Sequence, residues 1–304
     1  MKGRISWAVV SLLVVTIAAG CTPREAGYHK AFLPLVAHNW TGPHKAGISW
    51  PKEDPLDRSV ALASIGGVAT MDWGRGSWRA EASAQHGIEF LPMWYDCNVN
   101  PADVAHAAQE HPGARWLVFN EPDNSWQADC KPEDAAIAYH ALWEAFQEAD
   151  PTARLYCCGT TTYPAHVSYH RWWSEAYYQI YGEWPKVDGF HLHSYAPAYS
   201  DRLNWENRQA ELEYFRQWQQ DQEWAKGKPV IISEWGVFGM QADVPAIVAE
   251  YLPQMFSYFE RTTWIELHLW FCTYEPQFSI SGIFEGDSDR LTPIGEAWKK
   301  ASER

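Results

Sequence analysis

Apolar segments of strand length alternate with amphipathic segments along most of this chain. Eight apolar segments are expected to form strands, over residues 47–50, 67–73, 88–95, 115–121, 154–160, 187–195, 229–236 and 264–271. The segments between them carry residues with three- and four-residue spacing, as amphipathic helices do. Strand and helix repeated eight times predict an α/β fold, a (β/α)8 TIM barrel built as a single domain over residues 45–304.

The expected helices have recognisable starts. Proline-containing segments at 54–55, 101–103, 131–134 and 292–293 each begin a helix, the second of which runs to residue 110 and the third to residue 150. Further helices are expected over 166–181, 203–226 and 243–261. We find no internal repeat and no low-complexity block beyond the first twenty residues, so the chain after residue 44 is read as one unit.

Polar and aromatic side chains gather where the expected strands end. In a parallel barrel the carboxyl ends of the strands carry the functional residues, whereas the opposite ends mainly stabilise the fold. Here those carboxyl ends hold Trp50, Asp72, Trp73, Trp94, Tyr95, Asn120, Glu121, His193, Tyr195, Glu234, Trp235 and Trp270. A functional site is therefore expected at this mouth of the barrel.

Two of these residues are glutamates that follow apolar runs on the fourth and seventh strands. Glu121 ends the run 115–119, and Glu234 ends the run 231–232. Side chains on these strands face each other across the mouth and can bring two carboxyl groups to about 5 Å, the separation used by retaining glycosidases. We expect Glu121 to be the acid/base and Glu234 the nucleophile, with the pKa of the proton donor raised by its neighbours. The alternative is a pair of unrelated loop carboxylates.

The polar residues beside this pair can serve it. Asn120 is expected to bind the 2-hydroxyl of a sugar, although an asparagine here also suits a turn. Tyr195 is expected to donate a hydrogen bond to the nucleophile, and His193 to line the same subsite. His191, two residues deeper in the strand, is expected to be a buried core histidine.

Tryptophan is unusually frequent, with 19 residues in 304. Flat aromatic faces bury a large area and stack on sugar rings, but they also fill wide cores. Trp270 is expected to form a platform under the reacting sugar, and Trp73, Trp94 and Trp235 to extend it, with core packing as the alternative for each.

Charge narrows the choice of partner. The formal net charge is −14, so the phosphate backbone of nucleic acid is repelled and a neutral polysaccharide or oligosaccharide is not. We expect no cofactor and no metal, and we expect a monomer.

The first residues resemble an export signal. Lys2 and Arg4 precede an apolar run over 7–19 that is too short to cross a membrane, and small residues then lead to Cys21. We expect a signal peptide over 1–20 and a tether over 21–44, with Cys21 lipidated. The protein would then be an exported cell-surface lipoprotein, or a secreted protein if Cys21 is not modified. The chain would touch the membrane only through that lipid anchor.

Export permits disulfides. Cys97 and Cys130 follow neighbouring strands and are the expected pair. Cys157 and Cys158 are adjacent in a strand, so they are expected to point to opposite faces as buried, unpaired residues.

Several segments together resemble one enzyme family. Asn120-Glu121-Pro122 is similar to the acid/base signature of the large clan of retaining (β/α)8 glycosidases, and the likeness is strongest to glycoside hydrolase family 128, the β-1,3-glucanases. It is carried by the segments 89–94, 119–123 with Gln127, 131–136, 187–190 with His193 and Tyr195, 233–236 and 291–295. Ser194 stands where that family has a tryptophan.

The resemblance extends over residues 45–304 and implies a glycosidase catalytic domain with a two-glutamate mechanism. It implies β-1,3-glucan as substrate, while xylan, mannan and cellulose stay open because the clan's other enzymes share the signature. A non-catalytic carbohydrate-binding barrel is a rival reading. A zinc hydrolase that uses His191 and His193 is a second rival, but no third ligand is evident in the sequence.

Overall fold

The computed structural model of the chain describes residues 44–304 except 77, 163, 198–202 and 239–242. The expected signal peptide over 1–20, Cys21 and the tether up to residue 43 lie outside the described residues. None of the helices in the described part is long and apolar enough to cross a membrane.

The described chain is a (β/α)8 barrel, as the alternating pattern predicted. Its strands are β1 (Ala46–Ile48), β2 (Ala69–Thr70), β3 (Glu89–Phe90), β4 (Met93–Trp94), β5 (Arg115–Asn120), β6 (Arg154–Gly159), β7 (Phe190–Pro197), β8 (Val230–Phe238) and β9 (Ile265–Trp270). Since β3 pairs with β2 and β4 pairs with β5, these two short strands are halves of the third barrel strand. The nine strands therefore fill the eight expected positions.

Parallel pairing continues around the whole ring. Strands β4, β5 and β6 pair in order, as do β7, β8 and β9, and isolated bridges join β6 to β7. Strand β9 pairs with β1, and backbone bonds such as that from Trp50 N–H to Met71 O (2.8 Å) join β1 to β2. The first strand thus lies beside the last, and the carboxyl ends of all the strands meet at one mouth.

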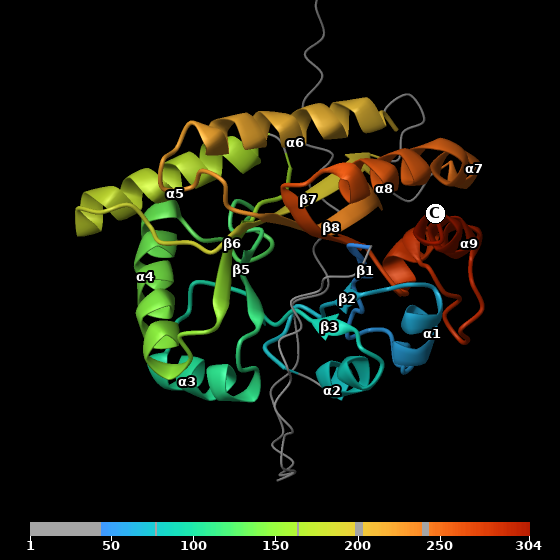
Figure 1. Cartoon of the computed structure of the whole chain (residues 1–304), viewed down its shortest axis with the longest axis horizontal. Helices are drawn as coiled ribbons and strands as arrows, with labels where there is room; N and C mark the ends of the chain where they lie inside the picture. Colours follow the sequence, from blue (N-terminus) through green and yellow to red (C-terminus); the bar gives the residue numbers. More distant parts are fainter. Residues whose placement is uncertain (1–43, 77, 163, 198–202, 239–242) are drawn as a thin grey trace, which may run out of the picture.

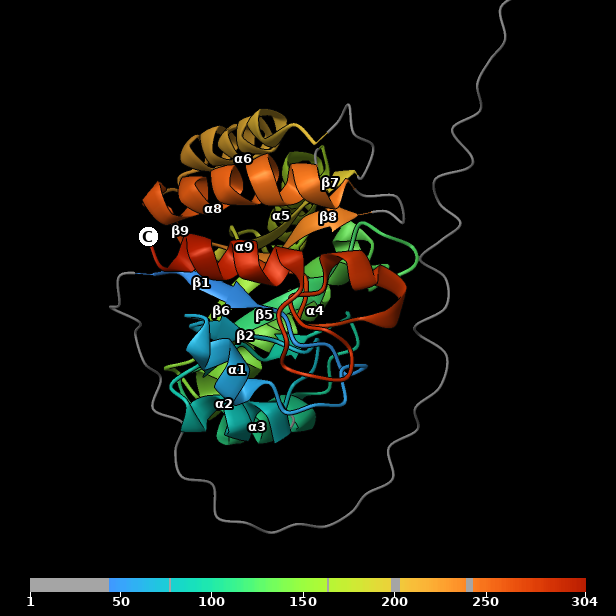
Figure 2. The same ribbon diagram turned by 90° about the vertical axis from the view of Figure 1, so that its right-hand side faces the viewer.

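Helices surround this ring of strands (Figures 1 and 2). They are α1 (Ser59–Ser64), α2 (Trp78–Gln85), α3 (Pro101–Glu110), α4 (Pro132–Ala149), α5 (Ala165–Tyr181), α6 (Trp205–Gln220), α7 (Val244–Ala246), a π-helical turn (Ile247–Tyr251), α8 (Leu252–Arg261), a 3-10 helix (Pro276–Ser281) and α9 (Pro293–Ser302). Helices α6 and α8 lie side by side in both views and contact each other.

Local sequence explains several helix starts. The side chain of Asn100 accepts a hydrogen bond from Ala102 N–H before α3, and that of Thr292 accepts one from Gly295 N–H before α9. Both helices have proline in the first turn, where its missing N–H costs nothing. These are the starts that the sequence predicted.

Two helix predictions were inaccurate. The helix expected from residues 54–55 begins only at Ser59, because the buried Asp54 carboxylate binds the Arg58 side chain (3.0 Å) and Leu56 N–H (3.2 Å) in a loop instead. Helix α2 was not predicted, since its short segment has only a weak apolar face.

The core has two layers. Residues Val68, Ala69, Met71, Leu91, Met93, Leu117, Tyr156, Ile231, Leu267 and Leu269 form one cluster. Because most strands of the ring contribute to it, this cluster fills the barrel interior. A larger cluster joins the outer faces of the strands to the helices. At the amino-terminal end of the strands, buried Arg115 pairs with Glu89 and Glu266, which closes that end with charge rather than with catalytic groups.

Candidate active site

Glu121 and Glu234 lie together at the carboxyl mouth of the barrel. Glu121 directly follows β5, and Glu234 lies within β8. One oxygen of each carboxylate and one ring nitrogen of His193 all lie within 4.8 Å of one another. Glu234 is buried, and the side chain of Glu121 is the more exposed of the two. Two carboxyl groups therefore share one small space.

Two donors hold the carboxylate of Glu234. The indole Nε1 of Trp73 donates to Oε1, and the hydroxyl of Tyr195 donates to Oε2, both at 2.6 Å. Burial raises the pKa of Tyr195 well above its ordinary value, with Glu234 adding to the effect, so this hydroxyl stays protonated. Both oxygens of Glu234 thus accept hydrogen bonds from groups that keep their protons.

Glu121 is held by a tight turn and by an amide. Asn124 Nδ2 donates to Glu121 Oε2 at 2.7 Å, and the backbone N–H of Asn124 donates to Glu121 O at 3.0 Å. The other carboxylate oxygen lies 3.0 Å from Nδ1 of His193. The orientation of this carboxylate is therefore fixed by its own loop and by β7.

His193 lies between the two glutamates, with Nδ1 beside Glu121 and Nε2 3.3 Å from Oε1 of Glu234. Burial lowers the pKa of this imidazole, but Glu234 and Glu121 outweigh burial, and the net pKa is raised. The sequence reading placed His193 in a sugar-binding subsite, and this is wrong: the side chain has no exposed surface.

The pKa of Glu234 is raised above the ordinary glutamate value. Burial is the largest cause and the charge of Glu121 adds to it, while His193 and the hydrogen bonds from Tyr195 and Trp73 oppose it. The sequence reading expected the raised pKa on Glu121. The structure has the raised pKa on the more buried partner, because desolvation outweighs the aromatic and acidic neighbours considered there.

Two residues of the site have left-handed backbone conformations. Trp73 has φ of 58° and Glu121 has φ of 46°, a region that costs a non-glycine residue about 1–3 kcal/mol. Glu121 directly follows β5, whereas Trp73 lies three residues after the end of β2, and the chain turns sharply at both. This turn directs the indole of Trp73 and the carboxylate of Glu121 into the mouth.

Asn120 is almost fully buried next to Glu121. Its Nδ2 donates to Oε1 of Gln127 at 3.3 Å, and the hydroxyl of Tyr95 donates to the same oxygen. Burial raises the pKa of Tyr95 to about 12, although Asn120 opposes this. Among the described residues, Oδ1 of Asn120 has no hydrogen-bond partner. This oxygen is buried, and the expected role of Asn120 in binding a sugar hydroxyl stays a prediction.

Asp123 joins the loop of Glu121 to the loop that follows β6. The backbone N–H and the hydroxyl of Thr161 both donate to its carboxylate, at 3.1 Å and 2.5 Å. Burial raises the pKa of Asp123, and the Thr161 hydrogen bonds oppose this. The loops after β5 and β6 are thereby fixed relative to each other.

The predicted aromatic platform is wrong for Trp270 and Trp235. Both side chains are fully buried and contact each other edge to face, with ring centroids 4.7 Å apart. Trp270 Nε1 also donates to Ser281 O at 2.7 Å. Because both rings lie inside the core between strands and helices, neither offers a face to a sugar.

Trp94 is also buried, so the platform reading fails for it too. Its Nε1 donates to Asn98 O at 3.2 Å, and the guanidinium of Arg75 lies 4.6 Å above the ring. Trp73 is the one tryptophan of the four that reaches the carboxylates. It does so as a hydrogen-bond donor to Glu234 rather than as a platform.

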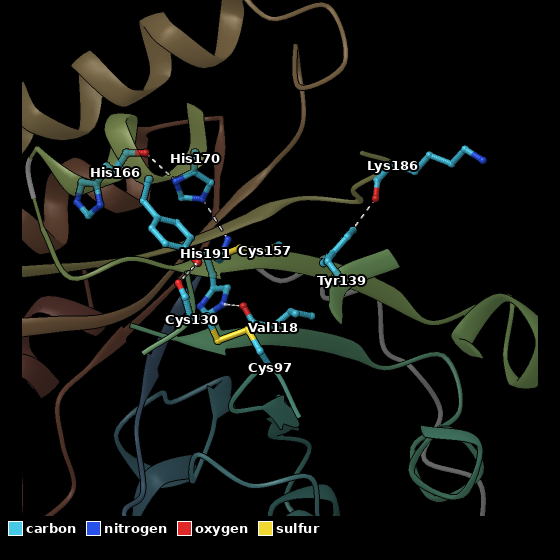
Figure 3. The surroundings of a disulfide bond; sticks show 11 residues. Cys97, Val118, Cys130, Tyr139, Cys157, His166, His170, Lys186 and His191 are labelled. Carbon is cyan, nitrogen blue, oxygen red and sulfur yellow. Dashed lines mark hydrogen bonds between the residues drawn. A yellow bond between two sulfur atoms is a disulfide. The ribbon is translucent and has the colours of Figure 1, made fainter. Parts of the chain in front are cut away.

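His191 is a core histidine, as expected. Nε2 bonds Val118 O at 2.9 Å (Figure 3), and Nδ1 bonds the hydroxyl of Ser233 at the same distance. Gly159 leaves the space for its ring, since a Cβ at that position would lie 2.5 Å from the imidazole. Burial lowers the pKa of His191 to about 3. With both ring nitrogens engaged, it offers no ligand to zinc.

Glu121, His193 and Glu234 are a group of potential metal ligands by distance. All four carboxylate oxygens, however, already have a partner, in Trp73, Tyr195, Asn124 and His193. A cation would have to replace these hydrogen-bond donors, so the residues present fit a pair of reactive carboxylates better than a metal centre.

A disulfide joins Cys97 and Cys130, the pair that the sequence singled out (Figure 3). It links the loop after β4 to the end of the loop that carries Glu121. The prediction for Cys157 and Cys158 was wrong, because these two are bonded to each other. That prediction assumed a regular pleated strand, whereas Thr160 N–H turns back to Cys158 O at 2.8 Å.

The sequence reading gave no role to Asn124 or Asp123, which orient Glu121 and its loop. Their signal was weak, since Asn and Asp after a strand usually indicate only a turn. Gln127 was noticed only through the family resemblance.

Comparisons with known proteins agree with this geometry. A sequence model of one family, described as the glycosyl hydrolase catalytic core, matches residues 63–298. A search of curated proteins gives no match.

Solved structures share the fold. An endo-β-1,3-glucanase of family 128 (subgroup II) from Pseudomonas viridiflava is 20% identical, with a TM-score of 0.67 over 84% of this chain and 96% of that one. A subgroup I endo-β-1,3-glucanase from Amycolatopsis mediterranei, in complex with laminaritriose, is 19% identical, with a TM-score of 0.66 over 84% and 99%. A subgroup III curdlan-specific exo-β-1,3-glucanase from Blastomyces gilchristii, in complex with glucose, is 20% identical, with a TM-score of 0.62 over 84% and 97%. The resemblance noted in the sequence thus recurs in three dimensions.

Proposed function

The chain belongs to the glycosyl hydrolase catalytic core family, and from that membership we propose that it is a retaining glycosidase that cleaves β-1,3-glucan. The observation that carries the proposal is the pair of carboxylates at the barrel mouth, with one oxygen of each within 4.8 Å. Retaining enzymes hold their carboxyl groups about 5–5.5 Å apart, whereas inverting enzymes hold them about 6.5–9.5 Å apart to admit a water molecule.

In this proposal Glu234 is the nucleophile. Two donors, Trp73 and Tyr195, fix both of its oxygens and favour the ionised form. One oxygen attacks the anomeric carbon, and the glycosidic bond breaks as the new ester bond forms. These donors partly offset the raised pKa that burial gives Glu234.

Glu121 is the acid and then the base. It is the more exposed carboxylate, and it protonates the glycosidic oxygen as the leaving sugar departs. In the second step it takes a proton from a water molecule, which attacks the same carbon and releases Glu234. Asn120, the residue before Glu121, would bind the 2-hydroxyl.

His193 supplies the proton that Glu121 needs. Its raised pKa favours the imidazolium form, which carries one proton on Nδ1 beside Glu121 and one on Nε2 beside Glu234. Moving the first proton along the 3.0 Å contact from Nδ1 to Oε1 of Glu121 gives the acid form without a proton from solvent. Glu234 is then the one negative charge of the pair, and Nε2 of the neutral imidazole lies 3.3 Å from its Oε1.

β-1,3-Glucan is the proposed substrate because the structural neighbours described above are named β-1,3-glucanases and one of them is in complex with laminaritriose. A net charge of −14 also suits a neutral polymer. The test is hydrolysis of laminarin, curdlan, lichenan, cellulose, xylan and mannan, with product sizing and the anomeric configuration followed by NMR. Release of β-anomers from laminarin or curdlan supports the proposal. Hydrolysis of only another glycan overturns the substrate, α-anomers overturn the retaining mechanism, and binding without hydrolysis indicates a carbohydrate-binding barrel.

We also propose that the protein is exported and lipid-anchored at Cys21, on the basis of the charged, apolar and small-residue segments before that cysteine. Mass analysis of the mature amino terminus tests this. A diacylglyceryl group on Cys21 supports anchoring, and an unmodified mature chain indicates a secreted protein.

A further inference from the structure

Trp126 is an exposed tryptophan on the loop that carries Glu121. Its side chain is 47% exposed, whereas Trp94, Trp235 and Trp270 are covered by protein. No aromatic ring and no cation of the described residues stacks on its indole. An open indole face is costly in water and is well suited to the apolar face of a sugar.

The loop keeps Trp126 close to Glu121. Consecutive turns are closed by Asn124 N–H to Glu121 O and by Gln127 N–H to Asn124 O, both at 3.0 Å. Ala128 N–H then donates to Asn120 O at 3.1 Å, which closes the base of the loop. Trp126 lies two residues before Ala128, so its Cα is within about 7 Å of the Cα of Ala128. Ala128 is in turn hydrogen-bonded to Asn120, the residue before Glu121.

One side chain connects the two directly. Asn124 donates from Nδ2 to Oε2 of Glu121 (2.7 Å) and accepts at Oδ1 from the backbone N–H of Trp126 (3.1 Å). The disulfide from Cys130 to Cys97 anchors the far end of the same loop. The backbone of Trp126 is therefore fixed relative to the acid/base carboxylate before any ligand arrives.

We propose that Trp126 forms the binding site for the sugar on the leaving-group side of the scissile bond, by stacking its indole on a glucosyl ring. This inference rests on the proposed function, in which Glu121 protonates the leaving oxygen. The departing sugar must then lie against the Glu121 loop, whereas the sugar attacked by Glu234 lies deeper, beside Trp73 and Tyr195.

Trp126 then also holds an acceptor sugar. After the first step, a glucan chain stacked there competes with water for the glycosyl group on Glu234. Its hydroxyl gives a proton to Glu121 and forms the new glycosidic bond as the ester bond breaks. Trp126 thus favours transfer to sugar over hydrolysis.

The experiment compares two glycosyl substrates, laminarin and β-laminaribiosyl fluoride. Each is tested with the parent, with Trp126→Ala and with Trp126→Phe. Laminarin needs the leaving-group site, whereas β-laminaribiosyl fluoride has a leaving group of one atom and does not. We expect Trp126→Ala to lower kcat/KM for laminarin about tenfold to a hundredfold, with Trp126→Phe between it and the parent. For the fluoride, all three should agree within about twofold, and transfer products should fall in Trp126→Ala.

Trp172→Ala is the matched control, because Trp172 is also an exposed tryptophan (57%) and belongs to α5 rather than to the Glu121 loop. This variant should keep the parent's kcat/KM for both substrates. Equal loss on both substrates, or an unchanged laminarin rate in Trp126→Ala, overturns the inference while leaving the proposed function intact. A parent that hydrolyses no β-1,3-glucan defeats the proposed function, and with it this inference.

Discussion

Trp73 donates a hydrogen bond of 2.6 Å from its indole Nε1 to Oε1 of Glu234, which lies 161 residues further along the chain. The sequence suggested Trp73 as a stacking surface, and the structure instead uses its one polar atom. The same bond is one of the influences that lower the pKa of Glu234 against the effect of burial. This contact therefore bears on the fraction of the nucleophile that is ionised.

Replacing Trp73 by Phe should shift the acid limb of the pH–activity profile to higher pH. The substitution keeps the ring and removes the donor, so the pKa of Glu234 rises and a higher pH is needed to ionise it. A hydrogen bond to a charged group contributes about 1.5–3 kcal/mol, which corresponds to a shift of about one pH unit or more. The measurement is kcat/KM for laminarin against pH. An acid limb that stays where the parent has it would show that this bond does not tune Glu234.

Each catalytic glutamate should be dispensable for folding and required for turnover. Glu234→Ala should lower kcat by at least about four orders of magnitude, and Glu121→Ala by about two to four, since the latter removes only proton transfer. Azide should partly restore Glu234→Ala with a product of inverted configuration. Circular dichroism establishes that both variants are folded. Turnover at the parent's rate in either variant would remove that residue from the mechanism.

Trp270 gives the opposite case, a tryptophan whose loss should affect stability. It is fully buried, packs edge to face on Trp235 and donates to Ser281 O. Trp270→Ala should lower the free energy of unfolding by about 3–5 kcal/mol, as for other large core residues. Denaturant unfolding measures this. If Trp270→Ala instead keeps the parent's stability and raises only KM, Trp270 does contact sugar.

The sequence predicted the eight strand positions and the two glutamates because both follow from simple rules. Alternating apolar and amphipathic segments indicate a parallel barrel, and the ends of its strands meet at one mouth. The rule says which residues reach the mouth but not which way each side chain turns. Trp270 and Trp235 therefore looked equivalent to Trp73 in the sequence.

The left-handed backbone at Trp73 and Glu121 explains why the directions of these two side chains could not be predicted from the sequence. These conformations turn the side chain away from the regular alternation of a strand, and no residue type marks them in advance. The position of His193 between the two glutamates was not predicted from the sequence, for a related reason. A histidine near the end of a strand suggests a lining residue, and only the packing of β5, β7 and β8 brings both carboxylates to its ring.

The disulfide between Cys97 and Cys130 should stabilise the fold and the Glu121 loop. It closes a loop with a sequence separation of 33 residues, for which chain entropy alone gives about 3–4 kcal/mol. The Cys97→Ser, Cys130→Ser double variant should lose stability of that order and some kcat, because the loop of Glu121 loses one of its anchors. Chemical reduction gives no clean comparison, since it would also act on Cys157 and Cys158. Unchanged unfolding in the double variant would mean that the bond does not form in solution.

Buried neutral histidines should make the protein sensitive to mild acid. Burial lowers the pKa of His170 to about 4 and that of His191 to about 3, while an unfolded histidine has a pKa near 6.5. As the pH falls below about 6.5, the unfolded chain binds protons that the folded chain cannot. Stability should therefore fall between about pH 6.5 and pH 4, by about 1 kcal/mol per pH unit for each of these histidines.

His193 contributes with the opposite sign. Its folded pKa is raised, so its stabilising effect is present below the unfolded pKa and is lost as the pH rises through the folded value. The acid slope is thus the sum of His170 and His191, together with His111, His166 and His268, whose pKa values burial also lowers, acting against His193. His191→Gln isolates one member of that sum, because it removes the titrating ring while keeping a polar side chain in the core.

The free energy of unfolding of His191→Gln should be lower than the parent's at pH 7, since the contacts with Val118 and Ser233 are lost or weakened. The informative quantity is the slope between pH 6.5 and pH 5, which should be shallower than in the parent by about 1 kcal/mol per pH unit. His86→Gln, at an exposed position, is the control and should keep the parent's slope. If His191→Gln and the parent lose stability in parallel as the pH falls, His191 is not held neutral in the core, and the acid sensitivity has another source.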